Sequence, residues 1–136
     1  MSKRTYTLIG IALGFLIITL VATRLYLNRE AMLERRHHLL CEVLKPGMSK
    51  DQALTVLGQV GDFTMSEGDW LGGDIELNIG FTDSKVADKY GDFFSLLFID
   101  NKYQRAYVRR GSDNWEVICD FYQPTESPTR TPIQIP

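Results

Sequence analysis

The sequence predicts an α+β protein with a long N-terminal helix, a second short helix, and a four-stranded antiparallel meander sheet that has the helices on one face. Three observations support this fold class. Residues 5–23 form an uncharged apolar run, residues 49–58 carry the signals of a capped helix, and from residue 75 onward apolar and polar residues alternate. Alternation is the period of a half-buried strand, and helices followed by a run of strands are typical of α+β domains.

Residues 5–23 are expected to span a membrane, after a short N-terminal tail at residues 1–4. The nineteen uncharged residues would extend roughly 28 Å as a helix, close to the about 30 Å thickness of the hydrocarbon core of a bilayer. Tyr6 and Tyr26 lie where interfacial aromatic residues belong. A cleaved signal peptide is the main alternative, but the apolar run is long for one, and residues 20–22 form a poor cleavage site.

Gly10 and Gly14 form a G-x-x-x-G spacing inside this run. Such a spacing allows two transmembrane helices to approach closely, either in a homodimer or with a different membrane protein, and it also arises by chance in apolar helices. The two glycines are therefore candidates for a helix-packing site within the bilayer.

The membrane helix is expected to continue into the soluble region as one long juxtamembrane helix. No glycine or proline interrupts the chain between Phe15 and Lys45, and Pro46-Gly47 then ends the helix. Its far end carries an apolar stripe that is expected to pack on the domain core. The stripe consists of Leu33, Leu40, Val43 and Leu44.

A second helix is predicted to start at Ser49. Gln52, three residues later, completes a capping box of the S-x-x-Q type, and Met48 is placed to pack on Ala53 as a hydrophobic staple. Gly58 is the expected C-terminal stop of this helix.

Four strands are predicted in the domain, which occupies residues 24–122 together with the juxtamembrane helix. Asp100-Asn101-Lys102 favours a tight hairpin between the second and third strands. A short edge strand at residues 63–65 is an additional option, and the proline-rich residues 123–136 are expected to form a disordered tail. The four strands lie at residues 75–81, 93–99, 104–109 and 115–121, and the last alternates Trp115, Val117, Cys119 and Phe121.

Cys41 and Cys119 are the two cysteines of the chain. One ends the first helix and the other lies on the last strand, so a helix packed on that sheet would bring them together. Outside the cytoplasm they are expected to form a disulfide, whereas in the cytoplasm two buried thiols are expected. His37 lies four residues before Cys41, but two ligands do not make a zinc site, and no metal site is predicted.

The composition and motifs argue against several classes of function. The net charge of −2 disfavours nucleic acid as a partner, because such an interface needs a basic face. No nucleophile motif or phosphate-binding loop is present, so no catalytic residue, cofactor or small-molecule substrate is predicted. Trp70 is a candidate partner contact, because exposed tryptophan is energetically important in interfaces, and a lid at the edge of the core is the alternative. The acidic residues between Asp51 and Asp100 suit either solvated loops or a basic partner.

The run from Leu44 to Gly58, LKPGMSKDQALTVLG, resembles the start of the BamE (SmpA/OmlA) family, in which Gly-Met-Ser/Thr opens a helix and Gly closes it. The F-x-D-x-K hairpin at residues 98–102 is also similar. The resemblance covers roughly residues 40–110 and implies two helices on an antiparallel sheet. It also implies a non-enzymatic scaffold in an envelope assembly complex. The chain departs from the lipoproteins of that family in having a membrane helix and no lipidated cysteine after it.

The expected function is that of a membrane-tethered, non-enzymatic interaction module, which acts as a scaffold or accessory subunit of a cell-envelope or membrane protein complex. Its expected partners are the lipid bilayer and other membrane or envelope proteins. A single-pass sensor or ligand-binding domain that signals through the continuous helix is the alternative. The expected location is the inner (cytoplasmic) membrane with the domain outside the cytoplasm, although the arginines after the apolar run favour the cytoplasm by the positive-inside rule.

Overall fold

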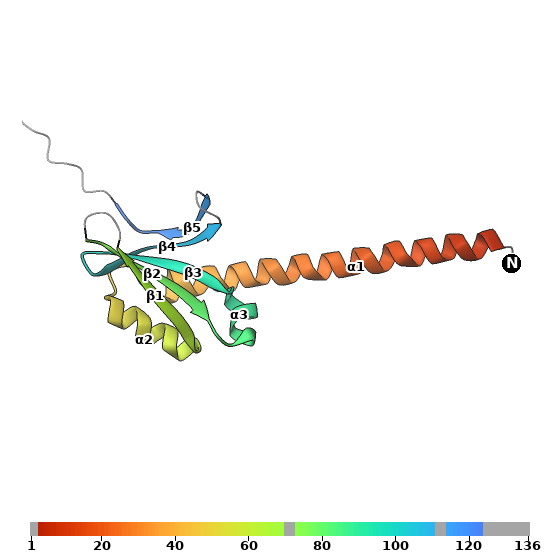
Figure 1. Cartoon of the computed structure of the whole chain (residues 1–136). Coiled ribbons are helices and arrows are strands. Elements are labelled where there is room, and N and C mark those ends of the chain that lie inside the picture. Colours follow the sequence, from red (N-terminus) through yellow and green to blue (C-terminus); the bar gives the residue numbers. More distant parts are fainter. Residues whose placement is uncertain (1–2, 70–72, 111–113, 124–136) are drawn as a thin grey trace, which may run out of the picture.

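The computed structural model describes residues 3–69, 73–110 and 114–123, and it has the α+β class that the sequence predicts (Figure 1). Trp70 and most of the proline-rich segment, residues 124–136, lie outside the described residues. A long helix projects from a small domain made of further helices and an antiparallel sheet. The sheet has five strands, so the expected count of four is wrong.

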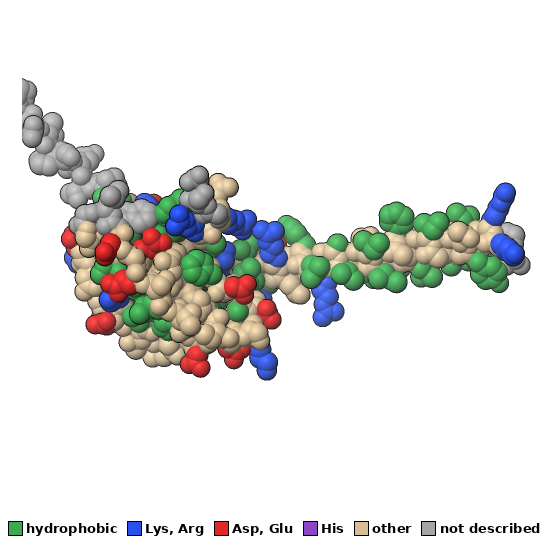
Figure 2. All heavy atoms as spheres, viewed as in Figure 1, with side chains coloured by type: hydrophobic (Ala, Val, Ile, Leu, Met, Phe, Trp, Pro, Cys, Tyr) green, Lys and Arg blue, Asp and Glu red, His purple; other side chains and the backbone are tan. Residues whose placement is uncertain are grey.

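The helix α1 runs from Lys3 to His37, which is 35 residues, or about 52 Å. Among the described residues it is the one helix that is long and apolar enough to cross a membrane. No part of its most apolar segment is buried by the domain. Figure 2 shows hydrophobic side chains along the projecting part of this helix. By length and composition, α1 is therefore a candidate membrane span.

After α1 the chain forms a π-helix, η1, at His38–Val43, where the sequence predicts a continuing α-helix. The N–H of Leu44 donates to the carbonyl of Leu39 at 2.9 Å, five residues earlier. A π turn contains an extra residue, so it changes which side chains point toward the sheet. As a result Leu39 and Leu40 are buried together with Leu44, whereas Val43, which is predicted in the buried stripe, is exposed.

The helix α2, Lys50–Val60, starts with the predicted capping box. The N–H of Gln52 donates to the Ser49 hydroxyl, and the N–H of Ser49 donates to the Gln52 side chain. The predicted stop at Gly58 is wrong, because the helix continues through this residue and has Gly61 as its C-cap. Gly61 is in an extended conformation and its N–H donates to the carbonyl of Leu57 at 3.2 Å, so the helix ends three residues later than predicted.

The sheet contains five strands in chain order, each antiparallel to the next. They are β1 (Phe63–Asp69), β2 (Ile75–Phe81), β3 (Phe93–Ile99), β4 (Lys102–Arg110) and β5 (Asn114–Asp120). The fifth strand is β1, which begins at the optional edge strand of residues 63–65, continues to Asp69 and pairs with β2 along its full length. Because β1 is a largely exposed edge strand, its sequence FTMSEGD has no regular apolar alternation. The β3–β4 hairpin turns at Asp100 and Asn101, whose φ values of 52° and 58° fit a type I′ turn.

A third helix, α3, occupies Ser84–Tyr90 between β2 and β3, and the sequence pattern does not predict it. Asp83 is its N-cap, with a carboxylate that accepts from the N–H of Lys85 at 2.8 Å. Gly91 follows the helix with φ +94°, a backbone conformation that glycine adopts at little cost. Seven residues are too few to show a helical period, so only the two caps indicate this helix.

One face of the sheet packs against the helices and forms the core. The end of η1 and the apolar side of α2 meet β2, β3 and β4 there, and burial of these apolar side chains is the main stabilising contribution. The most buried members are Leu40, Leu44, Ala53, Leu57, Leu77, Ile79, Phe94, Leu96, Phe98, Tyr103 and Ala106.

A β-bulge in β5 turns the side chains of Trp115 and Val117 away from this core. Ala106 pairs with Cys119, but the next residue, Tyr107, pairs with Val117, so Ile118 is an extra residue in β5. Cys119 therefore belongs to the core, whereas Val117 shares the opposite face with Tyr107. The bulge therefore breaks the regular alternation that is predicted for this strand. We call the side of the sheet away from the core the open face.

We predict that Gly58→Ala stabilises the protein by about 0.5–1 kcal/mol, because glycine is less favourable than alanine inside a helix. Gly58 is exposed in α2, and a β-carbon there would meet nothing within 4 Å. Urea unfolding of the full-length chain in detergent micelles, followed by tryptophan fluorescence, measures the change.

Gly61→Ala is the matched control for this prediction. A β-carbon at Gly61 would lie 2.9 Å from Cγ2 of Val86, so we expect this variant to be less stable than the wild type. A Gly58→Ala variant that unfolds at lower urea concentration than the wild type would contradict the position of Gly58 inside α2.

Candidate functional site

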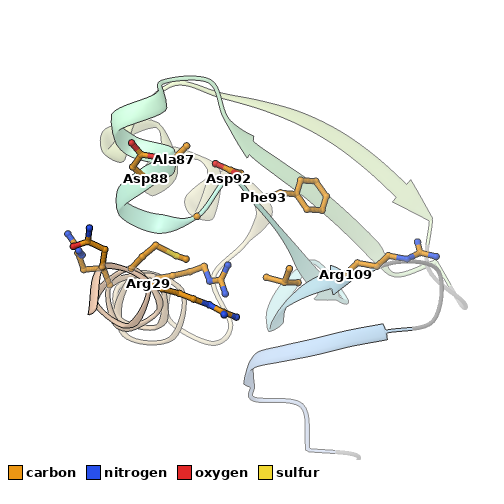
Figure 3. Close-up of a pocket in the computed structure, with 12 residues that line it drawn as sticks. Arg29, Ala87, Asp88, Asp92, Phe93 and Arg109 are labelled. Carbon is orange, nitrogen blue, oxygen red and sulfur yellow. The ribbon is translucent and has the colours of Figure 1, made fainter. Parts of the chain in front are cut away.

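A cleft of about 710 Å³ lies where α1 meets the domain. Its walls are the last turns of α1, the helix α3 with the turn that follows it, and β4. Figure 3 shows Arg29, Asp88 and Arg109 around this cleft, each on a different one of these elements. Apolar side chains complete the lining, among them Met32, Phe93 and Val108.

Arg36 is the buried charged residue of this cleft. Only 6% of its surface is exposed, and its guanidinium lies against Gly91, where a β-carbon would be 2.9 Å from Nη1. Burial lowers the pKa of Arg36 from its usual value, Glu116 opposes this effect, and Arg110 adds to it. Because the arginine pKa starts so high, the guanidinium stays charged at neutral pH. The domain therefore holds a positive charge at its junction with the long helix.

A disulfide between Cys41 and Cys119 joins η1 to β5. The Cα atoms of the two residues are 5.7 Å apart, within the range that disulfides span. Tyr103 makes a second connection, because its buried hydroxyl donates to the carbonyl of Leu40 at 2.6 Å. Burial also raises the pKa of Tyr103 above its ordinary value, so the hydroxyl remains a donor. Together these bonds attach the end of the long helix to the sheet.

The open face carries a shallow depression of about 240 Å³, which we call the open-face patch. Trp115 and Val117 are 41% and 52% exposed there, beside the buried Tyr107. The rings of Trp115 and Tyr107 have centroids 4.9 Å apart, and the guanidinium of Arg109 lies 5.5 Å from the Trp115 ring. Tryptophan, tyrosine and arginine are the residue types enriched at protein interfaces. The patch is lined by Leu97, Arg105, Tyr107, Trp115 and Val117.

The sequence-predicted site residues occupy separate places. Gly10 and Gly14 lie four residues apart on α1, and a β-carbon on either would meet nothing within 4 Å, so both leave room for a second helix. Trp70 lies outside the described residues. Across the described part of the chain, no three His, Cys, Asp or Glu side chains are grouped so that they could hold a metal ion.

Two features of the site are absent from the sequence-based prediction. In the sequence, Arg36 is one of several basic residues after the apolar run, and its spacing does not indicate burial. The glycine at position 91 could have indicated that another side chain lies close to the end of α3. The open-face patch depends on the bulge at Ile118, which no local pattern indicates.

Comparison of the chain with protein-family models, with curated proteins and with solved structures gives no match. The resemblance to the BamE family therefore stays an expectation.

We predict that replacing Cys41 and Cys119 together by alanine lowers the free energy of unfolding by about 2–5 kcal/mol. The bond connects residues separated by 78 positions, so it removes much conformational freedom from the unfolded chain. The measurement is urea unfolding of the oxidised full-length protein in micelles.

Tyr103→Phe provides the comparison, because it removes the hydrogen bond to Leu40 and keeps the disulfide. Its expected cost is smaller, about 1–3 kcal/mol. A double cysteine variant as stable as the wild type would show that the disulfide does not stabilise the attachment.

Proposed function

We propose that this chain is a single-pass membrane protein whose domain is a non-enzymatic protein-interaction module, and that it serves as a scaffold or accessory subunit of a membrane or cell-envelope complex. The observation that carries the proposal is the open-face patch, where Trp115 and Val117 are exposed beside the Tyr107 ring. When a partner covers exposed apolar side chains of this kind, the free energy falls, which favours binding. A domain attached to a candidate membrane span would present this patch close to other membrane proteins.

We further propose that α1 is retained as an anchor in the inner (cytoplasmic) membrane and that the domain lies outside the cytoplasm. The large apolar side chains from Leu8 to Leu27 are exposed on α1, and transfer into lipid would remove them from water. The disulfide between Cys41 and Cys119 supports an oxidising compartment for the domain, because disulfides are rare in the cytoplasm.

A sensor that signals through α1 is the second candidate, and the cleft at the junction of α1 with the domain favours it. A ligand between α1 and α3 would contact both helices, so it would bind more tightly to one arrangement of the two than to another. The two candidates require different surfaces, since the scaffold depends on the open-face patch and the sensor on the cleft.

We predict that Val117→Asp releases the protein from its complex, because a carboxylate placed in an apolar interface loses its hydration without gaining a partner. The tagged full-length chain is extracted from host membranes with a mild detergent and its size is measured by gel filtration. The wild type is expected to elute well above the size of one chain in its detergent micelle, and Val117→Asp at that size.

Met65→Asp is the matched control. Met65 is 46% exposed and lies on the edge strand β1, paired with the core residue Ile79 and therefore on the side of the sheet away from the open-face patch. This variant should elute with the wild type. A wild type that runs only as a free monomer, or two variants that elute alike, would count against the proposal.

A further inference from the structure

Arg36 is largely buried in the cleft, and Glu116, which favours its charged form, makes no ion pair with it. It is 6% exposed and lines the space between α1 and α3. Within residues 3–69, 73–110 and 114–123, its guanidinium forms no hydrogen bond and no ion pair. Buried arginines are usually paired, since removing a charge from water is unfavourable unless another charge or acceptor replaces the water. An external anion would supply such a partner.

The charges around Arg36 make the cleft attractive to an anion. Glu116, the carboxylate that favours the charged form of Arg36, is already ion-paired with Arg110 at 2.8 Å. Guanidinium groups outnumber carboxylates in the cleft, so its net charge is positive. The charged side chains that line it are Arg29, Arg35 and Arg36, with Asp88 and Asp92; Arg109 also lines the cleft, but its guanidinium lies against the Trp115 ring.

We propose that this cleft binds an anion of the phosphate class, with Arg36 as its principal ligand. A guanidinium offers parallel N–H donors that match two oxygens of a phosphate group. Arg29 lies on the α1 wall of the cleft (Figure 3), where it adds positive charge, whereas the Arg109 guanidinium lies against the Trp115 ring. Met32 and Phe93 give the cleft an apolar part that suits the organic portion of a phosphate ester. The inference does not depend on the scaffold role, because anion binding requires no protein partner, and it names a ligand class for the cleft of the sensor candidate.

The phosphate group has two sources, a lipid headgroup and a soluble phosphate. Arg29 follows the expected membrane span by six residues, or about 9 Å along a helix. The headgroup zone extends about 5–8 Å beyond the hydrocarbon core, and a long arginine side chain can bridge the remaining distance. If α1 is the anchor proposed above, lipid phosphates therefore lie within reach of the cleft.

A purely structural role for Arg36 is the competing explanation. Its guanidinium lies against Gly91, next to the C-terminal end of α3, where a positive charge is favourable. Such a role predicts lower stability on substitution of Arg36 but no response to phosphate. The two explanations therefore differ in a measurable ligand response.

The test uses the full-length chain in phosphate-free maltoside micelles, as wild type, Arg36→Met, Arg36→Lys and Arg24→Gln. Arg24 is the control, because it is exposed on α1 and does not line the cleft. Melting temperatures are measured with inorganic phosphate or with dihexanoyl phosphatidic acid, at an ionic strength held constant with chloride. We expect a saturable rise of about 5 °C or more in the wild type and Arg24→Gln, a smaller rise in Arg36→Lys, and none in Arg36→Met.

A measurement on the wild type alone keeps the test decisive where Arg36→Met fails to fold. In ¹⁵N-arginine-labelled protein, the Nε–H signal of Arg36 is expected to shift on titration with the same two ligands. A response to the short-chain lipid alone identifies a headgroup site, and a response to inorganic phosphate identifies a site for soluble anions. An Arg36 signal that moves with neither ligand, or an Arg36→Met variant stabilised as much as the wild type, overturns the proposal.

Discussion

The attachment of the long helix to the sheet is the constraint on which the other features depend. The disulfide of Cys41 with Cys119 and the hydrogen bond from Tyr103 to Leu40 hold η1 against the last two strands. Leu40 and Leu44 are fully buried at the same place, so η1 cannot separate from the sheet without exposing core side chains to water. This attachment also fixes the final turns of α1, which places Arg36 against Gly91 and forms the cleft.

Both candidate surfaces arise where regular secondary structure is interrupted. The bulge at Ile118 exposes Val117 and Trp115 on the open face, and Gly91 provides the room that the Arg36 side chain occupies. The π-helix η1 is a third interruption, and it sets the positions of Leu40 and Cys41 relative to the sheet. Such irregular elements occur often at functional sites, because they orient side chains in ways that regular helices and strands do not.

The elements that the sequence predicts correctly are those with strong local signals. The Ser49 capping box, the hairpin at Asp100-Asn101 and the alternation of β2 each depend on neighbouring residues, and each appears in the structure. The predicted end of α2 is wrong because Gly58 and Gly61 are both glycines at which a helix could end. Only the contact of Gly61 with Val86 distinguishes them. The π-helix, the bulge at Ile118 and the burial of Arg36 depend on contacts between distant segments, so no local pattern reveals them. The candidate site is therefore less predictable than the fold.

We propose that a membrane-anchored helix holds a disulfide-linked domain outside the cytoplasm, and the most direct test is the side of the membrane on which the domain lies. A protease is added to intact spheroplasts that carry the protein with a C-terminal tag, and a thiol reagent reports on Cys41 and Cys119 in parallel. A domain outside the cytoplasm predicts that the tag is digested and that both cysteines react only after reduction. A tag that survives the protease, together with two thiols that react without reduction, would contradict it.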